Sequence, residues 1–295
     1  MGRKAFWGLL VAVLLVAPVA MQAQGDYLDV YIAHVKPEKV ADFTALAKKM
    51  VDANRRNNGD QWLAETVVYG EGGIYQFVSL RQNYGDADKG SDAFTNALNK
   101  AFGKDAADKM LHDWDSCLIS SRSELRKRRW DLSRKAPTDR AAYTKLIGTS
   151  RVLRTTIVHV RPGHVADFEA LLKDIKAAAE QVESAQPVLI SQAVEGTKGT
   201  TFYITSLRSG LDGYDKNSTT REILGEDGYK KFLQVNAESV EGVDSVIQRF
   251  SPELSNPPED IMAAAPDFWQ PKAVLATKAK PKSAGEKAST EKPKQ

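Results

Sequence analysis

Two nine-residue segments of the chain, Tyr27–Val35 and Val152–Val160, carry apolar side chains at alternate positions. A period of two is typical of a strand, so both segments are predicted strands. Pro37 and Pro162 follow them, and proline ends a strand but suits the first turn of a helix. The apolar residues that then recur at helical spacing are Val40, Phe43, Leu46, Ala47 and Met50, and in the second segment Val165, Phe168, Leu171, Leu172 and Ile175. Each segment therefore predicts a strand followed by a helix.

A hairpin and two helices are predicted after the first helix. Gln61–Tyr69 and Ile74–Arg81 have the composition of strands, and the glycines between them allow a tight turn. Ser91 is a candidate N-cap for a helix that Gly103 ends, and the next helix begins near Asp105. The inward stripe of this last helix is predicted as Ala107, Met110, Trp114 and Cys117, matched later in the chain by Tyr229, Phe232, Asn236 and Ser239.

Blocks of sequence recur in the same order, which indicates an internal duplication. His34–Leu46 returns as His159–Leu171, Ser79–Arg81 as Ser206–Arg208, and Gly103–Asp105 as Gly225–Asp227. A closing strand is predicted near Glu124–Leu132 in the first copy and over Asp244–Phe250 in the second. Each copy then has the order β-α-β-β-α-(α)-β, which is that of a ferredoxin-like unit.

The predicted domains follow from this duplication and from the composition of the two ends. They are a signal segment 1–23, a first repeat 26–133, a linker 134–150, a second repeat 151–255 and a disordered tail 256–295 rich in Lys, Ala and Pro. The signal segment predicts export to the periplasm or beyond the cell, and a protein that does not span the membrane; a retained membrane anchor is the alternative. The tail is either a solvated extension or a weak tether to anionic envelope components.

The strand that ends in His34-Val35-Lys36-Pro37, followed by Val40-Ala41-Asp42-Phe43, resembles the start of proteins in the dimeric α+β barrel superfamily. That superfamily includes antibiotic-biosynthesis monooxygenase, NIPSNAP-like and stress-responsive barrel domains. The resemblance implies an α+β fold in which residues 26–255 form two tandem ferredoxin-like repeats whose antiparallel sheets pair into one barrel. The expected molecule is a monomer with an intrachain pseudo-dimer. Fold resemblance says little about function.

Charge and cysteine content exclude some classes of protein. The net charge of +3 comes from the ends of the chain, and the predicted folded part is slightly acidic, which disfavours nucleic-acid binding. The one cysteine, Cys117, cannot form an intrachain disulfide. A dense basic run, residues 122–130, is interpreted as a solvated edge, with contact to an anionic polymer as the alternative.

The first strand of each copy supplies the first candidate site residues. His34 and His159 are candidates for a metal ligand or general base, but no metal-ligand cluster accompanies them, so a structural role facing the helices is favoured and no metal is expected. The opposite row, with Asp29 and Tyr31 in one copy and Arg154 in the other, is predicted to face the barrel interior. Asp29 and Arg154 occupy matching positions, so they are expected to pair or to form a charged wall for a ligand.

Other candidates lie on the hairpin and the last helix. Arg81 and Arg208 are retained at matching strand ends, where they hold either an anionic ligand group or an acidic neighbour. Aromatic side chains are candidates for a pocket wall in the first copy. The second copy has Asn236 at the position of Trp114, which suggests that only one copy retains a usable cavity. The candidate pocket residues are Tyr31, Trp62, Tyr75, Arg81, Trp114, Arg154 and Arg208.

The sequence lacks the motifs of common enzyme classes, including Gly-x-Ser-x-Gly, phosphate-binding loops and His-Glu-x-x-His, and no cofactor is expected. The favoured function is a non-catalytic binding or accessory protein that holds a small apolar or aromatic molecule within or beside the barrel. A cofactor-independent monooxygenase of the antibiotic-biosynthesis type is the first alternative. The second is a surface-interaction protein with a filled barrel and no ligand, which cavity volume would distinguish from the other two.

Overall fold

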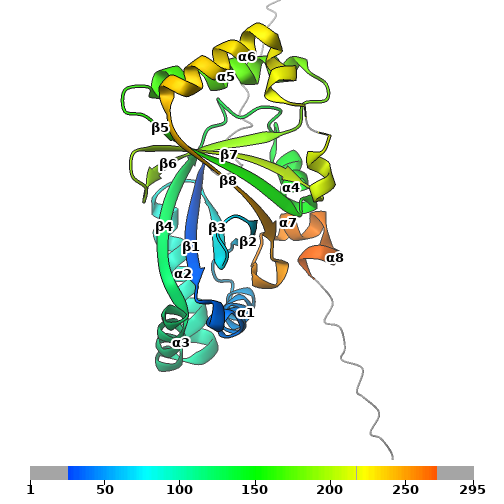
Figure 1. Ribbon diagram of the computed structural model, residues 1–295. Helices are drawn as coiled ribbons and strands as arrows, with labels where there is room; N and C mark the ends of the chain where they lie inside the picture. The colour runs from blue at the N-terminus through cyan, green and yellow to red at the C-terminus, as the bar shows by residue number, and fades with distance from the viewer. Residues whose placement is uncertain (1–25, 217, 271–295) are drawn as a thin grey trace, which may run out of the picture.

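The computed structural model describes residues 26–216 and 218–270 as a barrel of eight antiparallel strands with helices outside it (Figure 1). The predicted signal segment 1–23 and the lysine-rich part of the predicted tail, 271–295, lie outside the described residues. The strands are β1 (Tyr27–Val35), β2 (Leu63–Tyr69), β3 (Ile74–Arg81), β4 (Leu118–Arg128), β5 (Val152–Val160), β6 (Val188–Glu195), β7 (Thr200–Arg208) and β8 (Val240–Phe250).

Each half has one α-helix after its first strand and further helices between its third and fourth strands, and α4, α7 and α8 are additional. The α-helices are α1 (Val40–Arg56), α2 (Gly85–Phe102), α3 (Lys104–Ser116), α4 (Arg140–Thr149), α5 (Val165–Gln181), α6 (Thr220–Ser239), α7 (Glu259–Ala264) and α8 (Pro266–Trp269). The 3-10 helices are η2 (Pro37–Lys39), η3 (Leu211–Tyr214) and η4 (Pro252–Leu254).

The barrel closes within one polypeptide, as expected. Around it the strands run β1-β3-β2-β8-β5-β7-β6-β4, and every neighbouring pair is antiparallel. The registers of the two halves match: Asp29 lies opposite Ser79, and Arg154 lies opposite Ser206. Both first strands also carry an irregularity directly after the histidine, His34 or His159.

Most predicted strands and helices are present, but some of them begin at other residues than the sequence predicted. β1, β3 and β5 have the predicted bounds, and Gly103 ends α2 with a φ of +81°. However, α2 begins at Gly85 rather than Ser91, and β4 begins at Leu118 rather than near Glu124. The predicted linker 134–150 is not a plain connection, because it contains α4.

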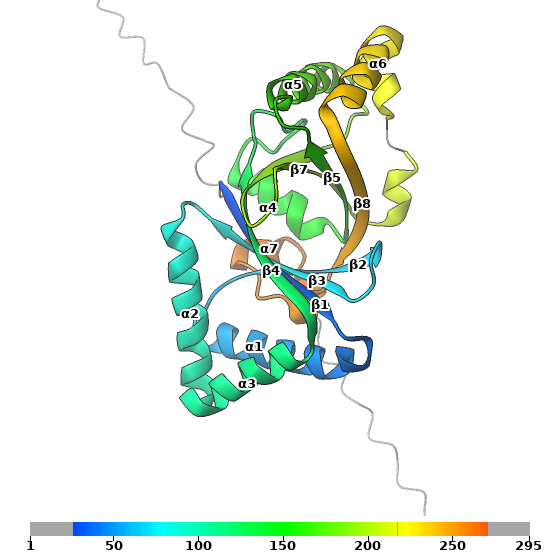
Figure 2. The ribbon, with the colours of Figure 1, turned by 60° about the vertical axis from the view of Figure 1, so that its left-hand side comes forward.

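The helices cover the outside of the barrel in two separate layers (Figures 1 and 2). α1, α2 and α3 cover the first four strands, whereas α5 and α6 cover the second four. The second layer is thinner, since only η3 and the first turn of α6 stand where the first half has the long helix α2. Gly225, with a φ of +68°, breaks α6 at the position that Gly103 occupies between α2 and α3.

The barrel interior is filled by the face of β1 that was predicted to meet the helices. Leu28, Val30 and Ile32 form a buried cluster inside the barrel, while Asp29 and Tyr31 face outwards to the helix layer. The predicted orientation of the two rows is therefore wrong. Both faces of a closed, helix-covered strand are buried, so an apolar row does not by itself identify the helix side.

A polar cluster lies within this interior. The Tyr203 hydroxyl donates to Glu124 Oε2 at 2.7 Å, and the Arg126 guanidinium pairs with the same oxygen at 2.7 Å while stacking on the Tyr203 ring. Nearby, Gln248 Nε2 donates to Glu65 Oε2 at 2.9 Å. The interpretation of residues 122–130 as a solvated edge is thus wrong: β4 pairs with β1 and β6, and alternate arginines point into the barrel.

The interior leaves a cavity of about 60 Å³ lined by all eight strands and by α4. That volume holds about two water molecules. A small organic ligand therefore has no room within the barrel.

One end of the barrel is closed by α4 together with α7 and α8, which belong to the predicted tail (Figure 2). The Trp269 side chain is completely buried, its Nε1 donates to the Gly148 carbonyl at 2.9 Å, and its ring packs against Phe250. Ile261 is completely buried in the same cluster. The expectation that disorder begins at residue 256 is therefore wrong for residues 256–270.

Replacing Trp269 by alanine is expected to lower the free energy of unfolding by about 3–5 kcal/mol, because the change leaves a cavity and an unpaired Gly148 carbonyl. Urea denaturation followed by circular dichroism measures the loss. Gln270→Ala, at the exposed neighbouring position, is the matched control and should be neutral. A loss below about 1 kcal/mol in Trp269→Ala would mean that the end cap is not part of the core.

Glu65→Gln is expected to stabilise the protein only at higher pH. Burial raises the pKa of Glu65 to about 7, although Arg126 and Arg128 oppose the shift. The protonated carboxyl therefore contributes stability that is complete below pH about 4.5 and lost as the pH rises through about 7. At pH 8 the variant should gain up to about 3 kcal/mol, and at pH 4 it should match the parent; a gain of equal size at both pH values would contradict the assignment.

Candidate ligand pockets

Two pockets lie between the outer face of the barrel and the helices, one in each half of the chain. The first, here called the aromatic pocket, has a volume of about 420 Å³. Its lining consists of Asp29, Tyr31, Ala47, Met50, Asp60, Trp62, Phe77, Ser79, Phe94, Leu111, Trp114 and Asp115. The second, here called the arginine pocket, has a volume of about 550 Å³ and includes Arg134, Arg154 and Arg208 in its lining. Both volumes lie in the range of small-molecule sites.

The aromatic pocket owes its walls to side chains from β1, β3 and α3 that fix one another. The Trp114 Nε1 donates to the Tyr31 hydroxyl at 3.3 Å, and the Trp114 ring lies 5.8 Å from that of Phe77. On the other side, the Trp62 Nε1 donates to the Leu254 carbonyl at 2.8 Å and the ring meets Phe94 edge to face. Because the indole groups are already bonded, the pocket presents ring surfaces to a ligand rather than polar edges.

One end of the aromatic pocket carries charge. Arg81 binds Asp60 through two hydrogen bonds, Nη1 to Oδ1 at 2.6 Å and Nη2 to Oδ2 at 2.7 Å, and also donates to Asp29 Oδ2 at 3.1 and 3.2 Å. Ser79 donates to Asp60 Oδ2 at 3.3 Å. Burial alone would lower the pKa of Arg81, but Asp60 and Asp29 outweigh it and raise the pKa.

This ion-pair group depends on space that a glycine provides. A Cβ at Gly90 of α2 would lie 2.4 Å from Arg81 Nη2, so a larger residue would displace the guanidinium. Among the hydrogen bonds of the described residues, Asp29 is engaged only through Oδ2. Its side chain is 31% exposed and lines the pocket, so Oδ1 can accept a hydrogen bond from a ligand.

The arginine pocket lies at the matching place in the second half. By strand register, Arg154 corresponds to Asp29, and Arg208 corresponds to Arg81. Asn236 of α6 lines it where Trp114 lines the first pocket. The expected Asp29–Arg154 pair is absent from the described residues: Asp29 is bound by Arg81, and the two positions line different pockets. The candidate residues thus divide between two sites.

The remaining candidates lie outside both pockets. Tyr75 is buried beside Phe43, with ring centroids 4.9 Å apart, and is part of the core. His34 Nδ1 is 3.6 Å from a Glu71 carboxylate oxygen, and His159 Nδ1 is 3.2 Å from the Thr201 hydroxyl. The histidines lie at the ends of β1 and β5 that lead to α1 and α5, in different halves of the molecule (Figure 1).

Metal-binding clusters and membrane-spanning helices are both absent from the described residues. Within residues 26–216 and 218–270, no group of three or more His, Cys, Asp or Glu side chains is arranged to hold a metal ion. In the same part of the chain, none of the helices combines the length and apolar character needed to cross a membrane.

Sequence reasoning missed several residues of the aromatic pocket. Asp60, Phe94 and Leu111 come from a loop and two helices whose distance from β1 the sequence does not disclose. Phe77 and Ser79 also line the pocket, and they share one face of β3 with Arg81. The sequence did hold one signal for this pocket. Arg81 belongs to a row on β3 that mixes aromatic and polar residues, and such a row is not typical of a strand face that is exposed to solvent.

The chain matches no protein family model and no curated protein sequence. Solved structures with a similar backbone include an anthrone oxidase-like protein, which is 12% identical with a TM-score of 0.50 over 78% of this chain and 93% of that one. A proposed monooxygenase from Lactobacillus acidophilus NCFM is 12% identical, with a TM-score of 0.46 over 77% and 94% of the chains. A chlorite dismutase from Candidatus Nitrospira defluvii in complex with imidazole is 9% identical, with a TM-score of 0.44 over 82% and 96%. Identities this low show the fold alone, which is that of the dimeric α+β barrel.

Arg81→Met is expected to destabilise the protein by about 3–5 kcal/mol, because it leaves the Asp29 and Asp60 carboxylates without a counter-charge. Combining it with Asp29→Asn and Asp60→Asn should recover much of the loss. Urea denaturation at pH 7 measures both, and Arg249→Met, at an exposed position on β8, is the control. Equal stability of the single and triple variants would contradict the importance of charge balance here.

Proposed function

We propose that this protein binds a small, flat, largely apolar molecule with a hydrogen-bond donor, such as a phenol, in the aromatic pocket. The observation that carries the proposal is the combination of ring surfaces along the walls with a carboxylate at one end. A flat ring gains contact area against Phe77 and Trp114, and its hydroxyl can donate to Asp29 Oδ1. An anion is disfavoured there, since Asp29 and Asp60 outnumber the one arginine.

The pocket supports this binding function over a purely surface-based one. The barrel interior is filled, which agrees with the surface-interaction alternative. However, the aromatic pocket beside the barrel has about seven times the volume of the interior cavity. Its walls are held by hydrogen bonds that exist without a ligand, such as that from Trp62 to Leu254. A preformed site avoids much of the ordering cost of binding.

Oxidation of the bound molecule by O₂ is the second candidate function. The favouring observation is the accessible Asp29 carboxylate beside the place where a phenolic or anthrone-like group would lie, because proton removal makes such rings electron-rich. The name of the anthrone oxidase-like structure suggests a balanced test reaction: a ring CH₂ and O₂ give a ring C=O and H₂O. The reaction needs no further redox partner.

We also infer that the two halves arose as tandem ferredoxin-like units. Each half has its strands in the order fourth, first, third, second, and the glycine break between its last two helices is retained. Export, predicted from residues 1–23, remains part of the proposal and would place the binding function outside the cytoplasm.

Leu111→Trp is expected to weaken binding of 1-naphthol by about tenfold or more, because the larger side chain fills part of the aromatic pocket. Leu233→Trp is the matched control: it makes the same change at the corresponding position on α6, where the side chain is 50% exposed. Isothermal titration calorimetry measures both. 1-Methoxynaphthalene, which lacks the donor, should bind about tenfold more weakly than 1-naphthol to the parent protein.

If Leu111→Trp binds 1-naphthol as the parent does, the ligand lies elsewhere and the proposal fails. If the two naphthalenes bind equally, the carboxylate has no role in recognition. An oxygen electrode with anthrone then separates the two functions: O₂ uptake that Leu111→Trp abolishes supports the oxidase, and binding without uptake supports the binding protein.

A further inference from the structure

The arginine pocket has the opposite charge to the aromatic pocket, although the two occupy matching places. In the first half, carboxylates neutralise Arg81. In the second half the corresponding arginine is Arg208, and the positions that supply those carboxylates hold Arg154 and Gln186. No aspartate or glutamate belongs to the described lining of this pocket. The described lining of the second pocket therefore carries arginines but no acidic side chain.

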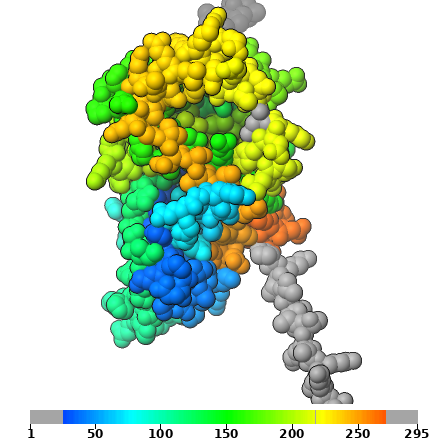
Figure 3. All heavy atoms as spheres, viewed as in Figure 1, coloured from blue at the N-terminus to red at the C-terminus, as the bar shows by residue number. Residues whose placement is uncertain are grey.

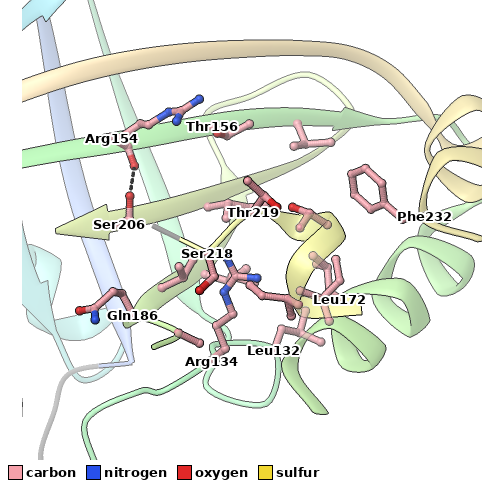
Figure 4. A pocket seen from close by; sticks show the side chains of 18 of the residues that line it. Leu132, Arg134, Arg154, Thr156, Leu172, Gln186, Ser206, Ser218, Thr219 and Phe232 are labelled. Atoms are coloured by element: carbon pink, nitrogen blue, oxygen red, sulfur yellow. Dashed lines mark hydrogen bonds between the residues drawn. The ribbon is translucent and has the colours of Figure 1, made fainter. Parts of the chain in front are cut away.

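A further arginine enters this pocket from the segment after β4. The backbone of Arg134 pairs with that of Val188 in β6, and the Arg134 side chain lines the pocket beside this strand. Figure 4 shows its side chain reaching into the pocket, with the guanidinium near Ser218. Its Nε is buried without a hydrogen-bond partner. Burial, reinforced by the charge of Arg208, lowers the pKa of Arg134.

Arg134 and Arg208 lie near enough for the charge of Arg208 to act on Arg134, and an anion placed between two partly buried like charges would relieve their repulsion. Arg208 is held in place by the Tyr214 ring, with its guanidinium 5.4 Å from the ring centroid, and by backbone carbonyls. Arg154 lies at the exposed rim, where its Nε is 3.5 Å from the Ser245 hydroxyl. Ser206 and Thr219 add hydroxyl groups to this polar end.

Much of the remaining lining is apolar. Leu132, Leu172 and Phe232 come from three different segments and face the cavity beyond the guanidinium of Arg134 (Figure 4). Beside this pocket, η3 and one helical turn stand where the first half has the long α2. Figure 3 shows the surface hollowed below α6, with green strands of the second half visible inside.

We propose that the arginine pocket is a second ligand site that binds the carboxylate of a small apolar acid. The carboxylate would lie between Arg134 and Arg208, and the apolar body would pack along Leu172 and Phe232. This site differs from the proposed phenol site in place and in charge. Each half would thus hold a different class of small molecule.

The experiment is isothermal titration calorimetry of the full chain with decanoate at pH 7.5, with 1-decanol and inorganic phosphate as comparisons. Decanoate should bind with a stoichiometry of one. Arg134→Gln and Arg154→Gln should each weaken it, by about 10- to 100-fold for the buried Arg134 and by less for Arg154 at the rim. Lys198→Gln is the matched control, since it removes one exposed charge from the β6–β7 turn of the same half.

A charge-reversed variant gives a sharper test. Arg154→Asp restores the residue type that pairs with Arg81 in the first half, so it should engage Arg208 and abolish decanoate binding without unfolding the protein. Circular dichroism and the urea midpoint check the fold.

Three results would overturn the proposal: no decanoate binding by the parent protein, decanol or phosphate binding as tightly as decanoate, or an equal effect of Lys198→Gln and Arg134→Gln. Leu111→Trp tests independence from the aromatic pocket. If it weakened decanoate as much as Arg134→Gln does, the acid would lie in the first pocket, which also contradicts the proposal.

Discussion

Closure of eight strands within one chain turns one face of every strand into a narrow interior, and helices cover much of the opposite face. The remaining features follow from this constraint. The inner face must fill a narrow space, which aliphatic side chains such as Leu28 and Val30 do, together with a polar cluster in which Glu124 is bound by Arg126 and Tyr203. The outer face must meet helices whose ridges leave gaps. Ligand-sized cavities therefore occur between strands and helices, and not within the barrel.

The two halves meet this constraint in the same way but differ in charge and in cover. In the first half, α2 lies over the sheet, and Gly90 on that helix leaves room for the guanidinium of Arg81 between its two carboxylates. In the second half the cover is short, and the matching arginine, Arg208, meets a ring and backbone carbonyls instead.

The sequence was sufficient to predict most strands, because each rests on a local pattern, and the family resemblance implied the closed barrel. It could not predict which face of β1 lies inside, since both rows are buried and the aliphatic row resembles a helix-facing one. It also missed the end cap. Trp269 lies beside a lysine-rich region of disorder-prone composition, and its burial depends on a hydrogen bond to Gly148, 121 residues earlier in the chain. Contacts at such separation leave no local pattern.

The position shared by Asp29 and Arg154 shows how the two sites came to differ. The neighbouring row is otherwise retained, as Ser79 with Arg81 and Ser206 with Arg208, and the strand registers agree. A carboxylate at this position balances the charge of the neighbouring arginine and leaves a pocket suited to a neutral ligand with a hydrogen-bond donor. An arginine there adds to the positive charge and leaves a pocket suited to an acid. Because the barrel holds the backbone of both halves in the same register, a change of one side chain type can alter ligand charge without altering the fold.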